Sequence, residues 1–135
     1  MLRGSCLCGA VRYEVTGDLL FMGHCHCSRC RKAHGAAYVT WGGIRPKEFR
    51  WVSGENLVQG YESSPGQQRC FCQKCGSPLV IAHGEEVREV VIGGIDGDPG
   101  ARPTEHIFVG SKAPWHEITD NLTRHETWPP GMGPG

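Results

Sequence analysis

Apolar and polar residues alternate in several short stretches of the chain, as they do in half-buried β-strands. The stretches with this pattern, or with many β-branched and aromatic residues, are 10–15, 37–41, 48–52, 57–61, 78–82, 87–95 and 106–109. Turn-forming residues separate them, for example Gly17-Asp18 and Gly97-Asp98-Pro99-Gly100. Helical patterns cover only 27–34 and 115–122, where Pro114 can start the second helix. The pattern therefore predicts an all-β fold with one or two short helices.

The composition agrees with a single turn-rich domain. A chain of 135 residues suits one domain, because domains cluster at about 100 to 150 residues. Its 20 Gly and 9 Pro argue against a helical bundle. We expect one domain over residues 1–128 and a flexible Pro/Gly tail over 129–135, where few apolar residues can anchor the chain.

Charge and hydropathy narrow the classes of partner. The formal net charge is +0, so no overall field attracts nucleic acid or an anionic membrane. The balance is uneven: residues 1–75 carry ten Lys or Arg against five Asp or Glu, whereas residues 76–135 carry four against nine. The longest apolar runs, 79–82 and 90–95, are too short to cross about 30 Å of hydrocarbon. With no secretory pattern at the N-terminus, we expect a cytoplasmic protein without nucleic-acid or membrane partners.

The eight cysteines are the strongest chemical signal. They form three groups: Cys6 and Cys8; Cys25, Cys27 and Cys30; and Cys70, Cys72 and Cys75. In the reducing cytoplasm, such clusters indicate metal binding rather than disulfides. A C-x-x-C turn brings two thiolates onto one Zn²⁺, and Gly76 permits the positive φ that such a turn needs. If Cys6 and Cys8 lie in a strand, both sulfurs point to the same face.

Spacing alone leaves the pairing of these groups open. Cys27 and Cys30 can join Cys72 and Cys75 in a four-thiolate site. Alternatively, Cys6 and Cys8 can join Cys72 and Cys75, which leaves the middle group as a set of three. The difference matters, because four thiolates close a structural site whereas three leave one position open for a substrate.

Four stretches of the chain resemble the glutathione-dependent formaldehyde-activating enzyme family. They are GSCLCGAVRY at 4–13, CHCSRCRK at 25–32, FCQKCGSPL at 71–79 and HIFVGSKAPW at 106–115. The resemblance implies an Mss4-like, all-β zinc fold with two zinc ions. It assigns a structural zinc to Cys6, Cys8, Cys72 and Cys75, and a second, open, catalytic zinc to Cys25, Cys27 and Cys30.

The resemblance also implies an activity. The family combines glutathione with formaldehyde to give S-hydroxymethylglutathione, a carbon–sulfur lyase reaction, so the expected partners are a small thiol such as glutathione and a small carbonyl compound. Three thiolates around Zn²⁺ carry a charge of −1 and make a weak Lewis acid, which favours thiol activation over hydrolysis. The alternative is a non-catalytic, zinc-stabilised module that binds a protein partner.

Several further residues are candidates for the second site. Arg31 and Lys32 either capture substrate carboxylates or offset thiolate charge. Lys112 and Trp115 line the site by family analogy, although Trp115 can equally be a core anchor. His24, His26 and His34 flank or interrupt the middle cysteine group; each can supply a ligand or move a proton, but an ordinary core or surface role is more common. We expect Cys70 to be a small core residue.

Overall fold

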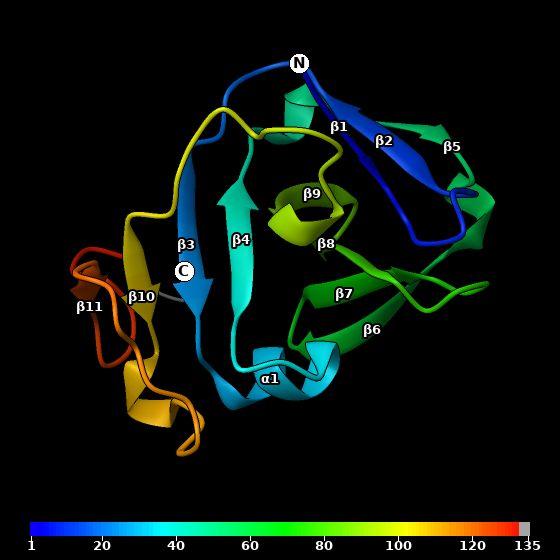
Figure 1. Ribbon diagram of the computed structural model, residues 1–135. Coiled ribbons are helices and arrows are strands. Elements are labelled where there is room, and N and C mark those ends of the chain that lie inside the picture. The colour runs from blue at the N-terminus through cyan, green and yellow to red at the C-terminus, as the bar shows by residue number, and fades with distance from the viewer. Residues whose placement is uncertain (133–135) are drawn as a thin grey trace.

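The computed structural model describes residues 1–132, which form mainly short strands and one α-helix (Figure 1). The strands are β1 (Leu2–Ser5), β2 (Arg12–Val15), β3 (Phe21–Cys25), β4 (Val39–Gly43), β5 (Phe49–Ser53), β6 (Val58–Ser64), β7 (Gln67–Cys72), β8 (Pro78–His83), β9 (Glu86–Val91), β10 (Glu105–Ile107) and β11 (Thr123–Arg124). The helix α1 spans Ser28–His34. Short 3₁₀ turns cover Pro46–Glu48, Glu55–Leu57, Ile92–Gly94 and Val109–Ser111. The all-β prediction is confirmed.

The strands form two sheets. A three-stranded antiparallel sheet has the order β1-β2-β5, and an eight-stranded sheet has the order β11-β10-β3-β4-β9-β8-β7-β6. In the larger sheet β10 runs parallel to both β3 and β11, whereas the other neighbours are antiparallel. Figure 1 shows the small sheet to one side of the large one, with α1 joining the end of β3 to the start of β4.

Two hydrophobic clusters fill the interior. The larger is built on residues of both sheets, including Tyr13, Val15, Leu79, Val80 and Val90. The smaller consists of Cys25, Cys30, Val39, Trp41 and Ile81. Successive side chains of a strand point to opposite faces, so Val80 and Ile81 of β8 reach different clusters. β8 is therefore buried on both faces and lies between the two cores.

The alternating pattern located seven of the eleven strands in residues 1–132, but four were not recognised from sequence. β1 is short, β3 is interrupted by Gly23, β7 begins with the polar run Gln67-Gln68-Arg69, and β11 has only two residues. These strands are specified by pairing with neighbours rather than by a period of two. The predicted strand at 106–109 ends earlier, at Ile107, because Phe108 adopts a left-handed conformation with φ 58°.

The predicted helix at 115–122 is wrong. Only one turn forms there, closed by a hydrogen bond from the His116 N–H to the Ala113 carbonyl. The Lys112 ammonium donates to the carbonyls of Ala113 and His116, and the Asp120 carboxylate accepts from the Leu122 N–H. These side-chain bonds compete with the bonds that a continuing helix needs.

Within residues 1–132, no helix is both long enough and apolar enough to span a membrane. The tail predicted as flexible begins at Pro129, which is buried, while 130–132 are exposed. Residues 133–135 of that tail lie outside the described part of the chain.

Replacing Tyr13 with Phe should leave the free energy of unfolding unchanged or raise it by up to about 1 kcal/mol. The ring packs on Phe49 and Trp51, but its buried hydroxyl has no hydrogen-bond partner among the described residues. Urea denaturation of the variant and the unsubstituted protein measures the change. As a control, Gly4→Ala should destabilise the protein, because an added Cβ overlaps the Tyr13 ring. A loss of stability in Tyr13→Phe would show that the hydroxyl has a partner.

Candidate metal centres

The first cysteine group lies in a tight turn rather than in a strand. β1 ends at Ser5, and the Gly9 N–H closes the following turn onto the Cys6 carbonyl at 3.0 Å. Gly9 adopts a positive φ of 78°, which favours glycine. The Val11 N–H donates to the Cys6 sulfur at 3.3 Å. Cys6 and Cys8 therefore do not lie in a strand, but their two sulfurs still lie together, 3.5 Å apart.

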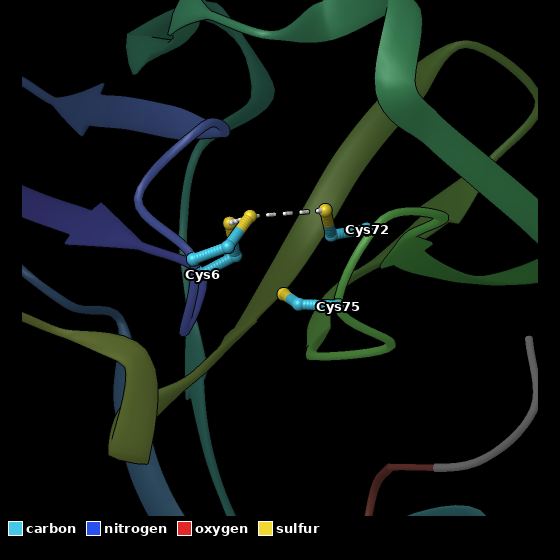
Figure 2. Close-up of side chains that lie close together, drawn as sticks. Cys6, Cys72 and Cys75 are labelled. Carbon is cyan, nitrogen blue, oxygen red and sulfur yellow. Dashed lines mark hydrogen bonds between the residues drawn. The ribbon is translucent and has the colours of Figure 1, made fainter.

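A second turn supplies the other pair of sulfurs. It follows β7, and the Gly76 N–H bonds to the Cys72 carbonyl at 2.7 Å. Gly76 has a φ of 79°, which confirms its predicted role. The Ser77 hydroxyl accepts from the Leu7 N–H at 2.9 Å and so links the two turns. Figure 2 shows Cys6, from the first turn, facing Cys72 and Cys75 from the second.

The four sulfurs fit a tetrahedral metal ion. Those of Cys6, Cys8, Cys72 and Cys75 all lie within 4.8 Å of one another, and the Cys8 to Cys72 separation is 3.9 Å. Thiolates at about 2.3 Å from a tetrahedral Zn²⁺ are separated by about 3.8 Å. The Ser77 hydroxyl and N–H lower the pKa of Cys75 to about 5, which favours the thiolate that a metal needs. We name this group the four-cysteine cluster.

The middle group forms a separate, three-cysteine cluster. The sulfurs of Cys25, Cys27 and Cys30 lie within 4.8 Å of one another, and this group includes no fourth ligand from residues 1–132. Cys25 ends β3, Cys27 caps the N-terminus of α1, and Cys30 lies in its first turn. The Cys30 N–H donates to the Cys27 sulfur at 3.3 Å. Hydrogen bonds from the other two thiols, with this N–H, lower the pKa of Cys27.

Two residues that the sequence did not single out contact the sulfur of Cys30. The indole N–H of Trp41, on β4, donates to it at 3.4 Å. A guanidinium nitrogen of Arg69, on β7, lies 3.7 Å away. Neither residue is close to Cys30 in sequence, and no motif marks them. Cys30 is buried, so these donors replace the water that would otherwise solvate its thiolate.

His26, His106 and Asp120 form a hydrogen-bonded row beside the three-cysteine cluster, and no histidine of residues 1–132 belongs to either cysteine cluster. His26 Nε2 lies 2.8 Å from His106 Nδ1, and His106 Nε2 lies 3.0 Å from an Asp120 oxygen. The carboxylate can only accept when ionised, so His106 carries its proton on Nε2 and its Nδ1 accepts from His26. His26 Nδ1 is buried without a partner among the described residues. Burial, chiefly, lowers the pKa of His26 to about 4, so His26 is neutral.

The predicted substrate-binding residues have different surroundings. Arg31 and Lys32 lie on α1, where Arg31 is half-buried and Lys32 is exposed. The Lys112 ammonium is held by backbone carbonyls of its own loop. Trp115 is 74% exposed, so its interpretation as a core anchor is wrong. Contact of these four residues with a substrate stays a prediction.

Cys70 and His34 lie outside both cysteine clusters and pack against other side chains. Cys70 lies outside both cysteine clusters and packs against the larger hydrophobic cluster, in line with its expected core role. His34 packs edge-on against Trp41, with ring centroids 5.5 Å apart. Burial lowers the pKa of His34 to about 4, and His34 lies outside the three-cysteine cluster.

Comparison with known proteins agrees with this arrangement. Residues 1–111 match the family of glutathione-dependent formaldehyde-activating enzymes. The chain belongs to this family. A Halomonas elongata protein that carries the same family name is 32% identical over 129 residues, which cover 87% of this chain and 81% of the relative. An uncharacterized lyase of Schizosaccharomyces pombe is 29% identical over 81 residues, which cover 60% of this chain and 57% of the relative.

A solved structure supports the same fold. The crystal structure of a Rhodobacter sphaeroides protein is similar, with a TM-score of 0.59 and 28% sequence identity. The match covers 75% of this chain and 97% of the other. The sequence resemblance to the formaldehyde-activating family is thus confirmed, as is its implication of a small β-rich fold.

Replacing one cysteine in each cluster should have different effects on folding. Cys72→Ser should lose one metal equivalent and unfold the domain, because a structural zinc can supply about 10 to 16 kcal/mol. Cys27→Ser should lose one equivalent and keep the fold, because its cluster joins β3 to α1 and not the two sheets. Metal analysis combined with circular dichroism measures both effects. Equal unfolding of the two variants would show that the clusters do not differ in this way.

The histidine row predicts specific tautomers. In the zinc-loaded protein at pH 7, His106 and His26 should both carry the proton on Nε2. Long-range ¹⁵N–¹H correlation spectra of the imidazole rings distinguish the two tautomers. Asp120→Ala should remove the preference at His106, whereas Asp98→Ala, at an exposed ion pair with Arg102, should not. A proton on Nδ1 of His106 in the unsubstituted protein would contradict the assignment.

Proposed function

We propose that the protein is a zinc-dependent carbon–sulfur lyase that interconverts glutathione plus formaldehyde with S-hydroxymethylglutathione. The observation that carries this proposal is the three-cysteine cluster, which stands apart from the four-cysteine cluster and has one ligand fewer. A site of three protein ligands is typical of catalytic zinc, and a site of four is typical of structural zinc. The family match and the lyase name of one relative support the same reaction class.

The donor set favours zinc at both clusters. All seven side chains offer sulfur, and grouped thiolates in tetrahedral geometry are typical of zinc. When bound by three thiolates, zinc would leave one position at which an incoming thiol loses its proton and stays nucleophilic near neutral pH. In this proposal the four-cysteine cluster holds the structural zinc and the three-cysteine cluster the catalytic one.

The protein residues around the three-cysteine cluster hold its sulfurs in place. The N–H of Cys30 fixes Cys27, while Trp41 and Arg69 fix Cys30. Cys27 is more exposed than the buried Cys25 and Cys30, so we place the substrate on the Cys27 side. Ordered donors of this kind need no reorganisation when charge develops during reaction.

The substrate carboxylates would meet basic residues of α1. Arg31 and Lys32 lie in the last turn of this helix and can attract the two carboxylates of glutathione. Lys112 and Trp115 complete the proposed substrate site. Because glutathione is kept reduced in the cytoplasm, we propose that compartment for the protein.

The chemistry forms one bond to carbon. The thiolate sulfur of glutathione attacks the formaldehyde carbon, and the carbonyl π-electrons move to oxygen, which takes the proton that the thiol released. The product is a hemithioacetal, and the reverse reaction breaks the same carbon–sulfur bond. Holding the two reactants together removes part of the entropic barrier.

Exchange NMR tests the proposal. The zinc-loaded protein should accelerate interconversion of glutathione, formaldehyde and S-hydroxymethylglutathione over the buffer rate. Cys27→Ser should lose the acceleration, while Cys70→Ser, matched in chemistry but outside both clusters, should keep it. A wild-type protein with two bound metal ions and no acceleration would overturn this substrate assignment and favour the non-catalytic binding module.

A further inference from the structure

Arg69 is placed by the large sheet so that its side chain reaches the three-cysteine cluster. It pairs with Ile81 of β8, a member of the smaller hydrophobic cluster, and with the exposed Tyr61 of β6. Its guanidinium crosses from β7 to α1, where Nη2 lies 3.7 Å from the Cys30 sulfur. In Figure 1, α1 lies below β6 and β7, in agreement with this contact.

The Arg69 guanidinium is a buried charge with too few partners. Its Nε and Nη1 are buried and have no hydrogen-bond acceptor among the described residues. No ion pair within residues 1–132 links Arg69 to a carboxylate. Arginine stays protonated in proteins, and an uncompensated buried charge costs several kcal/mol. The fold would not keep such a charge here without an anion nearby.

Neither of the other titratable groups near Arg69, Glu89 and His34, forms an ion pair with its guanidinium within residues 1–132. Glu89 is on the same face of the sheet, two strands away. Burial raises the pKa of Glu89, and the charge of Arg69 partly offsets that rise. His34 lies on the helix side, where burial and then the charge of Arg69 lower its pKa to about 4, so it is neutral. The contact at Cys30 therefore identifies the cysteine cluster as the anion.

We propose that Arg69 is the counter-ion of the three-cysteine cluster and stabilises its metal-loaded form through Cys30. Three thiolates and one divalent ion carry a net charge of −1, which the guanidinium balances. A hydrogen bond to a thiolate also makes that sulfur a weaker donor to the metal. Arg69 is thus a positioning residue that acts through Cys30. The inference rests on metal binding at this cluster, as the proposed function does, but not on the identity of the substrates.

Cobalt(II) titration of the metal-free protein tests the proposal without any substrate. Arg69→Gln should bind the second cobalt about 10- to 100-fold more weakly, as typical losses of an outer-shell partner are. The thiolate-to-cobalt charge-transfer band of that site should move to lower energy, because Cys30 loses a charged donor. The affinity and spectrum of the four-cysteine cluster should not change. Arg69→Lys should recover most of the lost affinity because it keeps the charge.

Arg88→Gln is the matched control. Arg88 is an exposed arginine of β9 whose partner, Glu86, is also exposed, so its loss should leave both cobalt sites unaltered.

Unchanged affinity and spectrum in Arg69→Gln would overturn the proposal. Equal weakening of cobalt binding at both clusters would also overturn it, because that would indicate a general structural role. If Arg69→Gln does not fold, Arg69→Lys decides: a loss as large as that expected for Gln overturns the counter-ion role. None of these measurements depends on formaldehyde, so a failed lyase assay leaves the test intact.

Discussion

The contact between two cysteine turns that are distant in sequence is the constraint on which the rest of the fold depends. The turn after β1 and the turn after β7 meet at the four-cysteine cluster, although Cys8 and Cys72 are 64 residues apart. Bringing the turns together closes a long loop, whose entropy favours the open chain. Four thiolates in contact also repel one another, so the close approach needs a compensating cation. A metal ion bound at this point would stabilise the docking of the small sheet against the large one.

β8 links the four-cysteine cluster to the three-cysteine cluster. The strand follows the Cys72–Cys75 turn directly, and Val80 packs with the core near the first turn while Ile81 packs beside Cys25 and Cys30. β7 likewise contributes to both sides of the sheet. Its Cys72 belongs to the larger hydrophobic cluster, and its Arg69 reaches Cys30 of the three-cysteine cluster. A strand cannot slip by one residue without exchanging its faces. The strand register that brings the four-cysteine cluster together therefore also decides which side chains surround the three-cysteine cluster.

The sequence contained the local parts of this arrangement. Alternation located most strands, the C-x-x-C turn required Gly76, and the helix beginning after Cys27 was visible. Spacing could not choose between the pairings of the cysteine groups, because the register that decides between them is not local; the family resemblance chose instead. Trp41 and Arg69 could not be found for the same reason, since each meets Cys30 only through the order of strands in the sheet. The helix predicted at 115–122 failed for a different reason. Hydrogen bonds from the side chains of Lys112 and Asp120 compete there with the backbone bonds of a helix.

The neutral net charge of the chain is the sum of a basic region, which holds both cysteine clusters, and an acidic remainder. All eight cysteines lie in the first 75 residues, which carry five more basic than acidic side chains. Arg69 is one of these. Its guanidinium keeps its charge when buried and offers donors in several directions. The positive charge that faces Cys30 is then fixed at any pH at which the thiolates are ionised, so the compensation is permanent.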